Sequence, residues 1–155
     1  MSASDVRQEL DKIEALASKY KGRLYHPLFF VQLNKKFQGK YGKVSDMLMN
    51  HAVLRYEFQP SGKVVWIVKG RGRDYLVYPE APYCHCTSFY MHIVGGKGSV
   101  CSHLAVQRIA STLNLQQAVI ERDELFSSLV NEWKNNYVRV SEDEVESQEQ
   151  GSQHN

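Results

Sequence analysis

The sequence has no long apolar run and no internal repeat. Its longest uninterrupted apolar stretch covers only residues 64–68, whereas a membrane-spanning helix needs roughly 20 residues. The N-terminal segment alternates charged and apolar residues and has no apolar core of a secretory signal peptide. No repeat has a solenoid or propeller period. We therefore expect an intracellular protein without a membrane partner, in a compartment that keeps thiols reduced.

Positively charged side chains are also missing from one region, since residues 141–155 contain five Asp and Glu residues but no Lys or Arg. The rest of the chain has 19 basic residues against 12 acidic ones, a net charge of +7. A basic body is compatible with a nucleic-acid or acidic-protein partner. A solvated surface with a solubilising tail explains the same charges. The tail has too few apolar residues to form a core, so we expect it to be disordered.

The first part of the chain predicts helices. Apolar residues recur at three- and four-residue spacing over 4–21. A second helix is expected over 27–38, because Pro27 suits a first helical position and Gly39 suits a helix end. A short third helix is expected over 45–50.

The apolar pattern then changes to that of strands. Segments 51–59 and 63–69 predict a β-hairpin, because a Pro-Ser-Gly turn separates two runs rich in β-branched and aromatic residues. A third short strand is expected over 74–78. Two further helices are predicted over 102–115 and 122–137.

Together these segments predict an α+β fold. The expected architecture is a small single domain with N-terminal helices, a short antiparallel β-hairpin or meander, a finger-like segment that contains all the cysteines, and C-terminal helices. The predicted regions are 1–50 (helical), 51–80 (β-hairpin), 81–115 (cysteine-containing finger and following helix), 116–140 (C-terminal helix), all within one globular domain over 1–140, and a disordered acidic tail over 141–155.

All three cysteines lie in one short segment. Cys84 and Cys86 flank a histidine, and fourteen residues later Cys101 and His103 flank a serine. Zinc prefers four soft or borderline ligands in a tetrahedron, and three cysteines with one histidine are an established structural set. The spacer contains three glycines, so it can turn back on itself. The pattern therefore predicts one structural zinc ion bound by these four residues.

Other interpretations of these residues remain open. The cysteines could simply be small buried hydrophobic residues. His85 could replace His103 as the fourth ligand, although ligation by three consecutive residues is strained. Cys101 could serve a thiol hydrolase, but the sequence has no nucleophile elbow or oxyanion loop. A closed four-ligand site leaves no position for water, so we expect a protein that is not an enzyme.

The C-x-C and C-x-H pairs directly before a predicted helix resemble the signature of a SWIM zinc finger. In this chain they are YCHC, the spacer TSFYMHIVGGKGSV, and CSHLA. The preceding segments FVQLNKKFQGKYGKVSDML and QPSGKVVWIVKGRGRDYLVY resemble the small SWIM proteins of the Shu complex in homologous recombination. The resemblance covers roughly residues 29–115.

Members of that subfamily are not enzymes but partners of RecA-like recombinase paralogues. The resemblance implies a nuclear DNA-repair protein that forms a heterodimer or larger complex with such a paralogue. The pair would promote assembly or stability of the recombinase filament, and would reach single-stranded DNA through the complex. Where the subfamily tends to carry an alanine, three residues after the ligand histidine, this chain has Val106.

Two apolar helix stripes are the candidate partner surface. Such stripes more often face the chain's own core than a partner. The predicted partner-binding residues are Phe30, Leu33 and Phe37 on the second predicted helix, and Leu129 and Trp133 on the last.

Direct DNA binding by the SWIM module is the alternative function. Its support is the basic body and two clusters of cations with aromatic residues nearby. The clusters are Lys35, Lys36, Lys40 and Lys43, and Lys69, Arg71 and Arg73.

Overall fold

The computed structural model describes residues 3–22, 27–86, 89 and 100–135. The acidic tail and most of the spacer between Cys86 and Cys101 lie outside the described residues. The elements are α1 (Ala3–Ser18), α2 (Pro27–Lys36), α3 (Val44–Met49), β1 (Val53–Gln59), β2 (Lys63–Lys69), β3 (Asp74–Tyr78), β4 (Tyr83–Cys84), α5 (Ser102–Leu113), β5 (Gln117–Arg122), the 3-10 helix η1 (Asp123–Leu125) and a helix over 126–135.

A five-stranded sheet is the centre of the fold, with the strand order β4-β3-β2-β1-β5. β1 to β4 form an antiparallel meander, and β5 pairs in parallel with β1 at the opposite edge. The β1–β2 turn requires glycine, because Gly62 has a φ of +78°. That turn is fixed to η1, since Asp123 accepts hydrogen bonds from the backbone N–H and the hydroxyl of Ser61.

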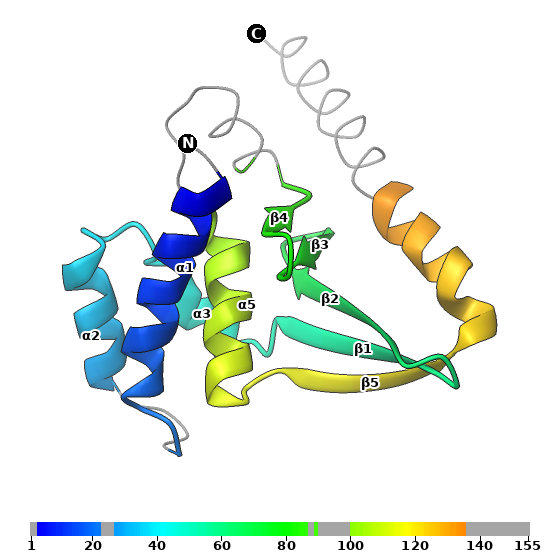
Figure 1. Ribbon diagram of the computed structural model, residues 1–155, viewed down its shortest axis with the longest axis horizontal. Coiled ribbons are helices and arrows are strands. Elements are labelled where there is room, and N and C mark those ends of the chain that lie inside the picture. Colours follow the sequence, from blue (N-terminus) through cyan, green and yellow to red (C-terminus); the bar gives the residue numbers. More distant parts are fainter. Residues whose placement is uncertain (1–2, 23–26, 87–88, 90–99, 136–155) are drawn as a thin grey trace, which may run out of the picture.

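Helices cover both faces of the sheet (Figure 1). Consecutive strand residues point to opposite faces, and the buried residues follow that alternation. Val53, Val68 and Val77 join the larger apolar cluster with α1, α2, α3 and α5. Their neighbours Leu54, Ile67 and Leu76 join a second cluster, which the helix over 126–135 closes with Trp133. α5 packs against both the helical layer and the sheet, and of the predicted zinc ligands it contains His103 and is capped by Cys101.

The α+β class is confirmed, but the sheet is larger and mixed. The region predicted as a C-terminal helix over 116–140 begins with β5, and its helix starts at residue 126, later than the predicted 122. β5 escaped the sequence analysis because it is an edge strand with no clear apolar alternation. Its Ile120 is 64% exposed. The preceding helix stops at Leu113 because Asn114 adopts the left-handed conformation, with a φ of 56°.

The structure separates the five predicted partner-binding residues into interior and partly exposed ones. Leu33 and Trp133 are interior residues, only 1% and 4% exposed, because their stripes face the chain's own core. Phe30, Phe37 and Leu129 are partly buried against the two clusters. No helix within the described ranges is long and apolar enough to cross a membrane.

Candidate metal centre

Four side chains from two distant segments converge beside the N-terminus of α5. Cys84 ends β4, Cys86 follows it, Cys101 caps α5, and His103 lies in the first turn of that helix. Their sulfur and nitrogen atoms all lie within 4.8 Å of one another. All three cysteines are buried and His103 is half-buried. These four residues therefore form a site that could hold one metal ion.

The sheet places the first pair of cysteines. β4 continues the antiparallel meander, with Cys84 opposite Val77 in the register of β3. The backbone N–H of His85 donates a hydrogen bond to the carbonyl oxygen of Leu76 at 3.1 Å, so the pairing extends past the strand end. Because this backbone bond anchors the residue between the two cysteines, both sulfurs are held at one edge of the sheet.

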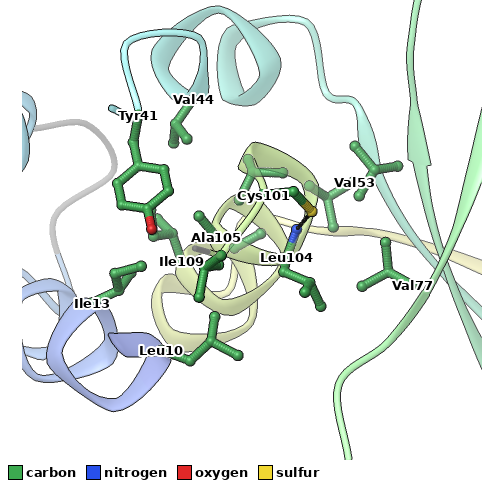
Figure 2. Packing of buried hydrophobic residues seen from close by; sticks show 14 of the residues in the cluster. Leu10, Ile13, Tyr41, Val44, Val53, Val77, Cys101, Leu104, Ala105 and Ile109 are labelled. Atoms are coloured by element: carbon green, nitrogen blue, oxygen red, sulfur yellow. Dashed lines mark hydrogen bonds between the residues drawn. The ribbon is translucent and has the colours of Figure 1, made fainter. Parts of the chain in front are cut away.

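The helix start places the second pair. Cys101 is the N-cap of α5 with extended backbone angles, and its sulfur accepts a hydrogen bond from the backbone N–H of Leu104 at 3.4 Å (Figure 2). The sulfur of Cys86 accepts one from the backbone N–H of Phe89 at 3.3 Å. Such N–H donors, together with the partial positive charge of a helix N-terminus, stabilise thiolates. The thiolate is the form that binds a metal.

Mutual contact shifts the ionisation of the cysteines. Hydrogen bonds from Cys101 and Cys84 lower the pKa of Cys86 far below that of an ordinary thiol. The pKa of Cys84 is raised, because its hydrogen bonds to Cys101 and Cys86 favour its protonated form. Three sulfurs so close together cannot all carry a negative charge without a cation, so the site favours a metal ion.

His103 supplies a separate indication of a metal. Its Nδ1 atom is buried and has no hydrogen-bond partner among the described residues. Buried polar side-chain atoms are usually paired, so an orphaned one indicates a missing ligand or ion. The ring is fixed by stacking on Tyr75, with centroids 4.1 Å apart and an angle of 27° between the planes. The residues present therefore fit a bound zinc ion, which would crosslink β4 to α5.

The group of converging donors includes His103 and not His85. Among the histidines considered as the fourth ligand, the structure thus brings together the set that the spacing predicted. The free-cysteine interpretation is weakened, since three buried sulfurs gathered around one histidine nitrogen form a better metal site than a hydrophobic cluster. Val106, at the position where the resemblance predicts alanine, is completely buried in the larger cluster.

One residue near the centre escaped the sequence analysis. The carboxylate of Glu9 in α1 accepts hydrogen bonds from Tyr41 Oη at 2.6 Å, Lys40 Nζ at 2.9 Å and the backbone N–H of Val100 at 3.1 Å. Burial raises the pKa of Glu9, but bonds from Tyr41, Lys40 and Val100 outweigh it, so the net shift is downward. Val100 directly precedes Cys101, so Glu9 connects the helical layer to the second pair of ligands.

Comparisons with known proteins agree with the chemistry of the site. No protein-family profile matches the chain, and no solved structure matches it significantly. A Dictyostelium discoideum protein described as a zinc finger SWIM domain-containing protein 7 homolog is 30% identical over 81 residues. The match covers 51% of this chain and 51% of that relative, so it spans about half of each. The similarity and the Cys₃His cluster together support a SWIM-type zinc finger that holds zinc.

Proposed function

We propose that this zinc-finger chain is a non-catalytic adaptor that pairs with a RecA-like recombinase paralogue. In this proposal it is a nuclear DNA-repair protein of the Shu-complex type, and the pair promotes assembly or stability of the recombinase filament on single-stranded DNA during homologous recombination. The observation that carries the proposal is the closed Cys₃His centre. The resemblance of the finger and its flanking segments to Shu-complex proteins supplies the kind of partner.

The chemistry of the centre favours a structural role over catalysis. A zinc ion with four protein ligands has no open position for water or substrate. The Cys101 residue is only 4% exposed, and its sulfur already accepts the N–H of Leu104 beside two other sulfurs. A nucleophilic cysteine has to reach its substrate and needs a base beside it. The base beside Cys101 is His103, which is itself one of the four donors of the centre. Using Cys101 as a nucleophile would therefore require dismantling the centre.

The outer face of α2 is the surface that best fits a protein partner. Leu28 and Val31 are 56% and 57% exposed, and their i, i+3 spacing places them on one side of the helix. Phe30 and Phe37 on the same segment are partly buried against the core. Large exposed apolar side chains in one patch are typical of interaction sites. We therefore keep α2 as the proposed docking surface and replace the interior Leu33 by Leu28 and Val31.

Purification from cells tests this function. A tagged copy of the full chain should co-purify with a RecA-like ATPase in about equal amounts, identified by mass spectrometry. The pair should elute as one species in size-exclusion chromatography. A chain that is monomeric and recruits no ATPase would overturn the proposal.

Direct binding of DNA is the second candidate, and one observation favours it. Four of the seven cations singled out in the sequence line a single cleft: Lys43, Lys69, Arg71 and Arg73. The other three are elsewhere, and Lys40 is paired with Glu9. On this view the module contacts the nucleic acid itself, with or without a protein partner.

A further inference from the structure

A cleft of about 970 Å³ opens directly beside the metal centre. Its walls come from α3, the end of β2, the turn between β2 and β3, and the start of α5. Cys86, Cys101 and His103 form part of its lining, so the cleft and the zinc site share a wall. Any loss of the metal would therefore disturb the cleft.

Positive charge dominates the rim of this cleft. Lys43 precedes α3, Lys69 ends β2, and Arg71 and Arg73 lie in the following turn, while Asp46 is the one acidic residue of the lining. Within the described part of the chain, Lys43, Lys69 and Arg71 are exposed and form no ion pair with an acidic side chain at 4.0 Å or less. These cations are therefore available to a ligand.

The metal centre does not neutralise the rim. Three thiolates around Zn²⁺ carry a net charge of about −1, and Asp46 adds another negative charge. Four cations exceed these two negative charges, so the cleft stays positive when zinc is bound. The rim therefore attracts an anion that reaches into the hollow.

We propose that this basic cleft binds the phosphodiester backbone of a single-stranded nucleic acid. The cations come from separate elements around a hollow, which suits a chain with one charge per residue. Arginine forks pair well with phosphate oxygens. A duplex presents its phosphates on a broad convex surface and reaches the cleft floor poorly. This inference rests on the second candidate function, direct binding of DNA, and adds the kind of strand and the residues that would hold it; it goes beyond the adaptor role, because the contact would belong to this chain alone.

The aromatic residue of the cleft predicts backbone recognition without base recognition. The ring of Tyr75 is already stacked on His103. Its edge also occupies the space beside Gly70, where an added Cβ would lie 2.7 Å from Tyr75 Cε2. Since His103 covers one face of the ring and Gly70 lies at its edge, the ring offers bases less surface than an open aromatic platform does. Binding should therefore depend little on base sequence.

Few phosphate contacts imply weak binding by the isolated chain. Each phosphate neutralised on a single strand contributes about −0.7 to the slope of log K against log salt, so four contacts give a slope of about −3. Non-specific dissociation constants are typically about 10⁻⁴ to 10⁻⁶ M. A partner that already holds the strand would strengthen this contact by raising its effective concentration.

The test is fluorescence anisotropy of a labelled dT oligonucleotide with the full, zinc-loaded chain over a salt series. The expected slope is about −3, with weaker binding to a duplex of the same length. The double variant Lys43→Glu/Arg71→Glu should lose at least about tenfold in affinity, because two of four phosphate contacts become repulsive. Lys35→Glu/Lys36→Glu, with the same change in charge on α2, is the control and should bind like the parent.

A charge-neutralising variant keeps the test decisive if the reversed charges disturb folding. Lys43→Gln/Arg71→Gln should keep the zinc and the thermal midpoint, bind dT more weakly than the parent, and lower the salt slope to about −1.4. The inference is overturned if the zinc-loaded parent does not bind dT at low salt, if both charge-reversal variants bind equally well, or if a polyglutamate peptide or the duplex binds better than dT. Co-purification of an ATPase is measured separately, so failure of the cleft and failure of the adaptor proposal give different results.

Discussion

Glu9 and Val100 are 91 residues apart in sequence, yet the Glu9 carboxylate accepts the Val100 backbone N–H at 3.1 Å. The same carboxylate accepts the hydroxyl of Tyr41, whose pKa is raised by burial and by this hydrogen bond, so the hydroxyl stays protonated and donates. A single carboxylate thus connects α1, the segment before α3 and the residue that precedes Cys101. The position of the second ligand pair depends on the helical layer as well as on the metal.

Glu9→Gln should destabilise the fold by about 1–3 kcal/mol, because charge-assisted hydrogen bonds are lost. Folding lowers the pKa of Glu9, so its contribution is complete above its ordinary pKa of 4.5 and is lost as the pH falls towards the lower folded value. The difference in free energy of unfolding between the parent and the variant should therefore shrink below about pH 4.5. Denaturant titrations of the parent and the variant at several pH values measure this difference.

Glu14→Gln is the matched control on the same helix, since it removes an exposed ion pair with Arg108. We expect Glu14→Gln to lower the free energy of unfolding by at most about 1 kcal/mol. Equal effects of the two variants would show that Glu9 has no special role beside the metal centre.

The chain should bind about one zinc ion. The Cys84→Ser and His103→Ala variants should not bind zinc, and the region around the centre should unfold in both. Zinc binding contributes directly to the folding free energy, often about 10 kcal/mol or more in small sites. His85→Ala should keep its zinc, because His85 is not among the converging donors. Metal analysis and thiol titration measure both. Zinc loss in the His85 variant equal to that in the His103 variant would contradict the ligand set.

Trp133→Ala should destabilise the chain by about 3–5 kcal/mol, because it leaves a large cavity. The Trp133 ring packs edge-on against Tyr56, with centroids 4.9 Å apart, and closes the second apolar cluster. Lys134→Ala, an exposed neighbour, should change stability by less than about 0.5 kcal/mol. A Trp133 variant that unfolds like the parent but no longer binds its partner would return this residue to an interface.

Deleting residues 141–155 should leave the thermal midpoint unchanged. Val145 is the only large apolar residue of that segment, so burial there could not compensate for the entropy of ordering fifteen residues. Thermal unfolding of the truncated chain measures it, and a clear drop in the midpoint would show that the tail packs against the domain.

The parts of the molecule that could be predicted from sequence depend on local patterns. Soft ligands at fixed spacing indicated the Cys₃His set, and β-branched runs around a Pro-Ser-Gly turn indicated the hairpin. β5 could not be recognised because it pairs with β1 from a distance, and Ile120 is left exposed on the sheet edge. Glu9 looked like any polar residue of an amphipathic helix. Its role arises from Tyr41 and Val100, which only the tertiary fold brings to it.

The most direct test of the adaptor proposal is to capture the partner from cell extract with chains whose exposed α2 residues are changed. Leu28→Glu/Val31→Glu alters two exposed residues of α2, and the control Gln8→Glu alters an exposed polar residue of α1. All three chains should keep zinc and thermal stability. We predict that the parent and Gln8→Glu chains retain a RecA-like ATPase from cell extract in about equal amounts, and that the double variant loses it. A parent chain that stays monomeric and retains no such ATPase would contradict the account.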